Sequence, residues 1–249
     1  MGTNTGHKLF MILYVNGDSH TAAAEAVSPA AFAEDDGYPE LGRRPHPANL
    51  QASWGQQLAN RLNAELICDA ESAASNYRIL RTTRDWMRTL RPWQSAVAVI
   101  QWSTWEREEW LHRGEYLQVG SSGTDWVPDE LADRYRQFVI NVDWNRCQQH
   151  WHQEIWQLHV DMTAAKIPHV FFNGNNLFDR IQDRRDWTNA YITPYSKYTY
   201  NQILLEADFA TVNAGSWHFG EMAHCFWAEF VLLYCIENNI LDPDAISVD

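Results

Sequence analysis

One serine lies where an apolar segment of strand length meets a sharp turn. Ser19 follows the apolar run 8–15 and precedes residues 22–26, which are rich in helix-forming alanine. Gly17 can adopt the backbone conformations that a sharp turn requires. A serine between a strand's carboxyl end and a helix's amino end lies among free backbone N–H groups that would stabilise an oxyanion. The stretch therefore predicts either a nucleophilic serine or a simple helix cap formed by Asp18 and Ser19.

Composition and charge limit the classes of partner. The chain has 249 residues, of which 45% are hydrophobic, and a formal net charge of −13. Nucleic-acid-binding proteins usually present a basic face, so this balance argues against a nucleic-acid partner. No apolar run reaches the ~18 residues of a membrane-spanning helix, and the first residues do not read as a secretion signal. We therefore expect a soluble protein made in a cytoplasm, with no membrane partner.

The cysteines and clustered histidines indicate neither a disulfide framework nor a metal site. The four cysteines are Cys68, Cys147, Cys225 and Cys235. None belongs to a Cys-x-x-Cys pair, and without a secretion signal they are expected to be reduced thiols. The spacing of His150, His152 and His159 matches no known ligand pattern. We therefore predict no metal and no cofactor.

Apolar runs of strand length alternate with helical patterns along most of the chain. The predicted strands are 8–16, 64–67, 95–101 and 169–173. The predicted helices are 52–62, 79–90, 129–139, 146–166, 199–206 and 221–238. This alternation predicts parallel strands joined by right-handed crossovers, with helices on both faces of the sheet. We expect a single domain over residues 1–249, a three-layer α/β/α sandwich whose mainly parallel sheet has about five strands.

Polar residues follow three of the predicted strands. Ser19 follows the first, Ser75 and Asn76 come soon after the second, and residues 101–107 follow the third. Because the carboxyl ends of parallel strands meet at one edge of a sheet, we expect these regions to form one site. A long loop with four prolines, residues 28–50, comes shortly after the serine. Loops of this length are often lids or binding loops.

The same segments resemble the motif blocks of the SGNH, or GDSL-type, hydrolase superfamily. Residues 17–19, Gly-Asp-Ser, look like its first block, with Ser19 as nucleophile. Residues 75–76 fall where the second block supplies an oxyanion donor, and residues 101–104 fall where the third block lies. His218 falls where the last block supplies the catalytic histidine. The resemblance implies an SGNH or flavodoxin-like form of the α/β/α sandwich.

Longer segments resemble, more narrowly, an uncharacterised group of phage-encoded SGNH-like proteins. These segments are 15–21, 74–83, 100–109 and 218–229. The resemblance implies synthesis in a host cytoplasm, with association with the virion as one option. The oligomeric state is left open.

The superfamily resemblance implies acyl transfer by a serine esterase or deacetylase. Ser19 would attack an ester carbonyl, and His218 would take its proton and return it to the leaving alcohol. The Ser19 backbone N–H, with a donor from Ser75 or Asn76, would hold the oxyanion. Asp18 would shape the turn. The substrate would be a small acyl ester or an acylated carbohydrate, including a polysaccharide.

The chain departs from the superfamily pattern in three blocks. Gly215 and Ser216 stand where an acid usually precedes the catalytic histidine. Ser103 or Thr104 would have to replace the third-block asparagine, and residues 74–75 the second-block glycine. These departures keep a second function class open, a phage structural or binding protein that has the fold without the chemistry.

The absent acid limits the activity that we expect. A catalytic imidazole needs an acceptor on its second nitrogen, which fixes the tautomer and stabilises the charged ring. A backbone carbonyl, Ser216 or a carboxylate from elsewhere, such as Asp208, would have to supply it. Because a neutral acceptor stabilises imidazolium less than a carboxylate does, we expect at most slow hydrolysis of activated esters. Restoring the acid as Ser216→Asp or Gly215→Asp is then expected to raise the rate.

Overall fold

A four-stranded sheet lies at the centre of the computed structural model, which describes residues 11–33, 44–121 and 127–242. Residues 34–43 of the predicted 28–50 loop therefore lie outside the described residues. The strand order is β2-β1-β3-β6, and every neighbouring pair is parallel, as the sequence predicted. The strands are β1 (Ile12–Asn16), β2 (Glu65–Cys68), β3 (Ala96–Trp102) and β6 (His169–Asn173).

The expected fifth strand is reduced to a single bridge beside β6. Tyr191 pairs in parallel with Phe171, and backbone hydrogen bonds of 2.8 and 2.9 Å join Phe171 to the two neighbours of Tyr191. Asn189 and Thr193 have φ angles of 65° and 44°. Because these angles lie in the left-handed region, the chain leaves the extended conformation on both sides of the bridge. The expectation of five strands was therefore wrong.

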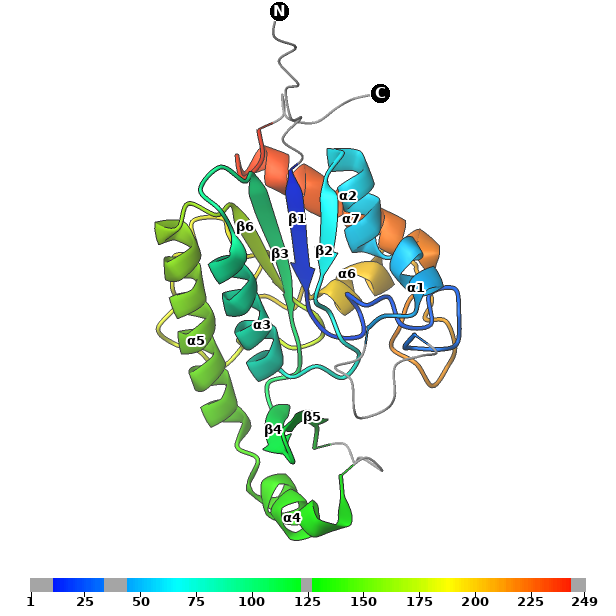
Figure 1. Cartoon of the computed structure of the whole chain (residues 1–249), viewed down its shortest axis with the longest axis vertical. Helices are drawn as coiled ribbons and strands as arrows, with labels where there is room; N and C mark the ends of the chain where they lie inside the picture. The colour runs from blue at the N-terminus through cyan, green and yellow to red at the C-terminus, as the bar shows by residue number, and fades with distance from the viewer. Residues whose placement is uncertain (1–10, 34–43, 122–126, 243–249) are drawn as a thin grey trace, which may run out of the picture.

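Alternate residues of the strands face two hydrophobic cores, one on each side of the sheet. Leu13 and Val15 pack with α2, α6 and α7, whereas Ile12 and Tyr14 pack with α3 and α5 (Figure 1). The six helices around the sheet are α1 (Pro47–Ala52), α2 (Trp54–Leu62), α3 (Asn76–Thr89), α5 (Trp144–Ala164), α6 (Tyr200–Glu206) and α7 (Glu221–Glu237). Burial of apolar side chains on both faces drives this packing. The predicted three-layer α/β/α arrangement is thus confirmed.

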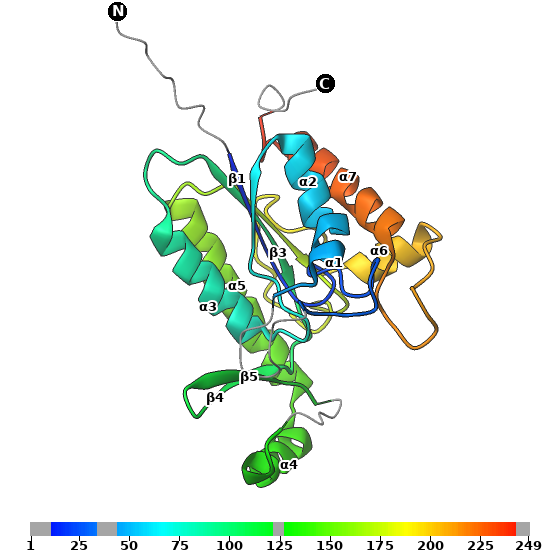
Figure 2. The ribbon, with the colours of Figure 1, turned by 45° about the vertical axis from the view of Figure 1, so that its right-hand side comes forward.

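A small hairpin and a helix lie between β3 and α5, at the end of the sheet toward which the strands point (Figures 1 and 2). The sequence predicted the helix near 129–139 but not the hairpin. Arg113 and Gly114, at the hairpin turn, have φ angles of 49° and 89°. A two-residue hairpin turn with positive φ at both central residues matches the twist of the flanking strands. The elements are β4 (Glu108–His112), β5 (Glu115–Val119), the 3-10 helix η1 (Asp129–Leu131) and α4 (Ala132–Asn141).

Candidate active site

Ser19 lies in a run of turns directly after β1. The carbonyls of Asp18 and Ser19 accept backbone N–H groups three to five residues further on, at 2.9 to 3.1 Å. Ala23 and Glu25 have φ angles of 53° and 64°, which an α-helix does not contain. The helix expected over 22–26 is therefore absent, and the interpretation of Asp18 and Ser19 as a helix cap is wrong.

A carboxylate from this turn contacts the predicted catalytic histidine. Glu25 Oε2 lies 2.6 Å from His218 Nδ1, and it accepts a hydrogen bond of 2.6 Å from the Ser216 hydroxyl. These hydrogen bonds from Ser216 and His218 hold the pKa of the Glu25 carboxyl below its ordinary value. Of the acceptors that the sequence left open, the structure thus selects a carboxylate, supplied by Glu25. Asp208 lies exposed two residues beyond α6.

Ser19, Glu25 and His218 line one cavity of about 320 Å³. Arg107 and Asn175, from the segments that follow β3 and β6, contribute to its wall. The cavity lies at the carboxyl ends of these strands, where open α/β sheets hold their sites. No hydrogen bond among the described residues joins the side chains of Ser19 and His218.

The Asp18 carboxylate is buried behind the serine and fixes the turn. It accepts hydrogen bonds from Gln101 Nε2 at 2.7 Å, from the Ser103 hydroxyl at 2.8 Å and from the Arg107 guanidinium at 3.3 Å. Burial raises the pKa of Asp18, but the charge of Arg107 and the hydrogen bonds from the His20 backbone N–H and from Gln101 help to hold this pKa below its ordinary value. The ionised carboxylate therefore joins the turn after β1 to the segment after β3, which agrees with a turn-shaping role.

Close packing against Gln101 explains the glycine of the motif. Gln101 Oε1 accepts the Asp18 N–H at 3.3 Å and the Thr21 hydroxyl at 2.8 Å. A Cβ atom on Gly17 would lie 2.9 Å from Gln101 Cβ, closer than real Cβ contacts. The turn can approach β3 this closely only because residue 17 has no side chain.

The two predicted oxyanion donors do not line this cavity. Ser75 caps α3, where its hydroxyl accepts a backbone N–H of the first turn, and its own N–H donates to Gln118 at 2.9 Å. Asn76 Nδ2 donates to the carbonyls of Ser103 and Thr104 at 3.2 and 3.3 Å. Because these groups hold α3 and the turn after β3, the oxyanion role is better assigned elsewhere. Ser103 and Thr104 do not line the cavity either.

The cavity residues that were missed from the sequence include His20, Glu25 and Arg107. The His20 ring meets the His218 ring edge-on, with centroids 5.6 Å apart. Burial lowers the pKa of His20 to about 4 despite the nearby Asp18, so the ring is neutral at pH 7. Glu25 is the one acid in the alanine-rich stretch after the serine, a signal hidden by the helical pattern of that stretch. No sequence motif marked Arg107, among the arginines of the chain, as a residue of the site.

Within the described residues, no three His, Cys, Asp or Glu side chains form a group that could hold a metal ion. The four cysteines form no disulfide. Across residues 11–33, 44–121 and 127–242, no helix has the length and apolar character needed to cross a membrane.

Comparison with known proteins gives one family match. A model of DUF6071, a family of unknown function, matches residues 40–164. No curated protein matches the chain.

Several solved structures are similar to this chain at low sequence identity. One, from Desulfitobacterium hafniense and described as a lipolytic protein of the G-D-S-L family, is 11% identical, with a TM-score of 0.47 over 92% of this chain and 99% of that chain. A G-D-S-L family member from Veillonella parvula is 13% identical, with a TM-score of 0.44 over 90% and 97%. An acetyl xylan esterase from the rumen bacterium Butyrivibrio proteoclasticus is 10% identical, with a TM-score of 0.40 over 92% and 64%.

Proposed function

The chain belongs to the family of unknown function DUF6071, and we propose that it is a serine ester hydrolase with Ser19, His218 and Glu25 as its catalytic triad. One observation carries this proposal. The Glu25 carboxylate lies 2.6 Å from His218 Nδ1, beside a cavity that Ser19 also lines. A histidine oriented by a carboxylate on one ring nitrogen keeps the other nitrogen for proton transfer, as acyl transfer requires.

The reaction follows from these three roles. Ser19 Oγ attacks the ester carbonyl carbon and forms a C–O bond while His218 Nε2 takes the hydroxyl proton. Collapse of the tetrahedral intermediate breaks the bond to the leaving alcohol, which receives that proton from the imidazolium. Water then repeats both steps on the acyl-enzyme and releases the carboxylic acid. Glu25 stabilises the imidazolium that forms in each half of the reaction.

The oxyanion requires donors other than Ser75 and Asn76. Among the described residues, no hydrogen bond occupies the Ser19 backbone N–H or the Asn175 side-chain amide. Asn175 and the Arg107 guanidinium line the same cavity as Ser19. We assign the oxyanion to the Ser19 N–H together with one of these two side chains, since donors fixed around the developing charge stabilise it most.

The substrate that fits is a small acyl ester, free or attached to a carbohydrate. The cavity of about 320 Å³ accommodates a short acyl group rather than a long chain. Such an enzyme would act as an esterase or deacetylase. The narrower likeness to phage-encoded proteins stays a prediction.

The alternative is a protein that has the fold without the chemistry and serves a structural or binding role. The lack of a hydrogen bond between Ser19 and His218 favours it, although such bonds are often longer before substrate binds. Labelling with a fluorophosphonate probe separates the two functions. The hydrolase should carry one adduct, on Ser19 by mass spectrometry, and Ser19→Ala should carry none. An unlabelled wild-type chain that hydrolyses p-nitrophenyl acetate no faster than Ser19→Ala would support the alternative.

A further inference from the structure

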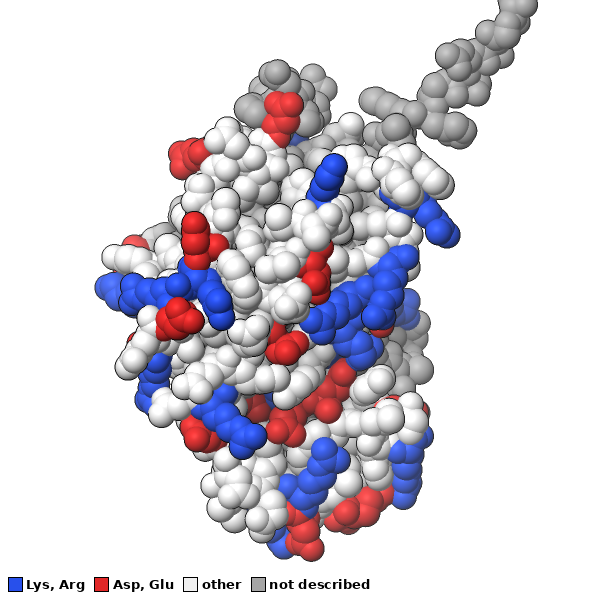
Figure 3. Space-filling view, turned by 90° about the vertical axis from the view of Figure 1, so that its left-hand side faces the viewer, with Lys and Arg blue, Asp and Glu red and all other residues white. Residues whose placement is uncertain are grey.

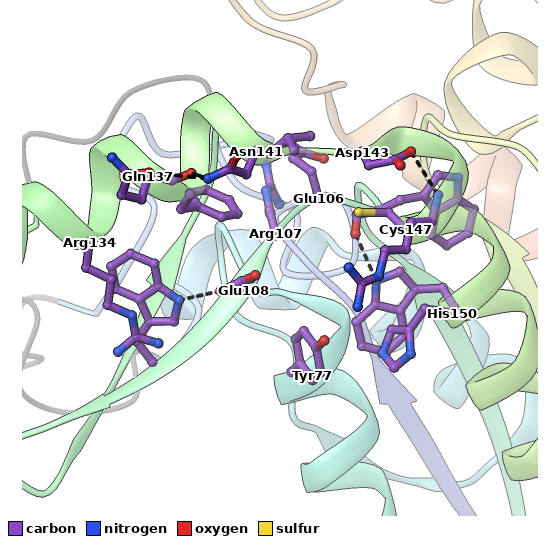
Figure 4. A pocket seen from close by; sticks show the side chains of 16 residues that line it. Tyr77, Glu106, Arg107, Glu108, Arg134, Gln137, Asn141, Asp143, Cys147 and His150 are labelled. Atoms are coloured by element: carbon purple, nitrogen blue, oxygen red, sulfur yellow. Dashed lines mark hydrogen bonds between the residues drawn. The ribbon is translucent and has the colours of Figure 1, made fainter.

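A second, larger cavity of about 970 Å³ lies beside the proposed site. Its walls come from the start of α3, the segment between β3 and β4, α4, and the start of α5, as Figure 4 shows. Arg107 lies in the wall of both cavities. A ligand that fills the larger cavity can therefore contact a residue that also lines the Ser19 cavity.

The larger cavity holds a buried carboxylate with an unused oxygen. Glu106 is only 8% exposed, and its Oε2 has no hydrogen-bond partner among the described residues. Glu108 and Asp143 line the same cavity. Burial of an unpaired carboxylate oxygen is costly, so a ligand that donates hydrogen bonds to Glu106 would remove this cost.

The same cavity is lined by an exposed aromatic ring, that of Tyr77. Tyr77 is 41% exposed, and its ring packs edge-on against Trp151, with centroids 4.6 Å apart. Figure 4 shows this ring rising from α3 into the space below α4. An aromatic face fixed in this way offers apolar surface at little entropic cost when a ligand stacks on it.

The charges of the cavity favour a neutral ligand. Besides its three carboxylates, the wall contains Arg107, Arg134 and Arg146. Arg107 is already bonded to Asp18, and Arg134 covers the Trp110 ring at 4.0 Å. Figure 3 shows basic and acidic side chains interspersed on this side of the molecule, with acidic ones gathered above its lower end. An anionic ligand would therefore meet opposing carboxylates.

We propose that this cavity binds a neutral oligosaccharide and presents an acyl group on it to Ser19. A sugar ring has an apolar face of C–H groups, which stacks on Tyr77, and hydroxyls, which donate to Glu106 and accept from guanidinium groups. The volume of about 970 Å³ holds more than one sugar ring. This inference rests on the proposed hydrolase function and assigns its substrate class, an acylated oligosaccharide or polysaccharide.

Binding is tested first, in a background that cannot turn substrate over. The Ser19→Ala chain is titrated calorimetrically with hexasaccharides of β-1,4-xylose, β-1,4-glucose and α-1,4-glucose, each with and without O-acetyl groups. At least one should bind, and Tyr77→Ala should weaken its affinity about tenfold. Glu106→Gln should also weaken the affinity for the oligosaccharide. Two independent variants make it less easy to mistake a folding defect in one of them for a loss of binding. The control is Tyr198→Ala, because Tyr198 is 43% exposed but lines neither cavity.

Kinetics of the active chain give the second readout. Tyr77→Ala should raise KM for the acetylated hexasaccharide that binds, with little change in kcat. Absence of binding by all of these sugars, or equal affinity in the Tyr77→Ala, Glu106→Gln and parent chains, would overturn the proposal. Binding that depends on Tyr77 but without any Ser19-dependent hydrolysis would instead defeat the hydrolase function and leave the oligosaccharide site standing.

Discussion

Glu25 is the single residue on which the proposed chemistry depends most. Glu25→Gln keeps an acceptor oxygen beside His218 Nδ1 but removes the charge that stabilises imidazolium. We expect kcat for p-nitrophenyl acetate to fall by about 10²- to 10⁴-fold. The matched control is Glu229→Gln, because Glu229 is an exposed carboxylate that pairs with the basic side chain of Arg61, away from the cavity. Steady-state rates that fall equally in both variants would remove Glu25 from the mechanism.

Ser216→Asp should lower the rate rather than raise it, because the site already has its acid. The Ser216 hydroxyl lies 2.6 Å from Glu25 Oε2, so an aspartate there would place two carboxylates side by side. Like charges at this separation raise the pKa of the pair and favour a protonated carboxyl. The acid limb of the pH–rate profile should therefore move to higher pH, with a lower rate at pH 7. A faster Ser216→Asp enzyme would show that Glu25 does not orient His218.

At the scale of elements, the sequence predicted best those strands and helices whose own residue pattern identifies them without reference to distant segments. Every residue of β1 and β6 is buried, and each strand contains a run of apolar residues, Ile12–Val15 and Val170–Phe172, as expected for parallel strands covered on both faces. The hairpin was missed because β4 and β5 are half-polar, and Trp110 finds its apolar neighbours in the distant α4 region. The helix over 22–26 was wrong because alanine content reports propensity, which tertiary contacts override.

The site was predictable only where a motif marks it. Ser19 and His218 fall at motif positions and do line one cavity. Glu25 and Arg107 follow no spacing rule, because the fold brings them there through turns and through the segment after β3. The sequence position of Asn76 did not show that its amide pairs with the backbone of Ser103 and Thr104, and its oxyanion role stays a prediction.

The β4–β5 hairpin offers a test of a turn element. Gly114 has a φ of 89°, and a Cβ added there would meet no atom within 4 Å. Gly114→Ala should therefore destabilise the chain by about 1 kcal/mol through backbone strain alone. Gly220 has equally open space but no positive φ, so Gly220→Ala carries no backbone strain and should cost less than Gly114→Ala, through the weaker N-cap of α7 alone. Urea unfolding measures both, and equal effects would rule out strain as the cause.

At the scale of the whole molecule, five buried histidines with lowered pKa values link stability to pH, and three of them have the largest shifts. Burial lowers the pKa of His20 and His169 to about 4 and that of His224 to about 3. In the unfolded chain each ring takes up a proton near pH ~6.5. Between the folded and unfolded pKa values the unfolded state binds more protons than the folded state. The contribution of these histidines to the free energy of unfolding is therefore complete above about pH 6.5 and is lost as pH falls. Urea unfolding should show a loss of up to about 4 kcal/mol per pH unit near pH 5.

His224→Asn should reduce that pH dependence. The Asn oxygen can accept the Trp54 N–H, which now donates to His224 Nδ1 at 3.3 Å, but it takes up no proton. The slope of unfolding free energy against pH should therefore fall by up to about 1.4 kcal/mol per pH unit, the contribution of one proton. A loss of stability that does not depend on pH would shift the whole curve without changing its slope, so the slope still reports the titration of His224. An unchanged slope would mean that His224 is not neutral in the native chain.

The proposed nucleophile and its acid, Ser19 and Glu25, share one short turn, whereas His218 comes from a separate loop closed by the bridge between Thr211 and Phe219. The three proposed catalytic residues therefore come from only two short segments of the sequence. A single segment grafted onto a related sheet would thus carry nucleophile and acid together, and only the histidine would have to come from elsewhere.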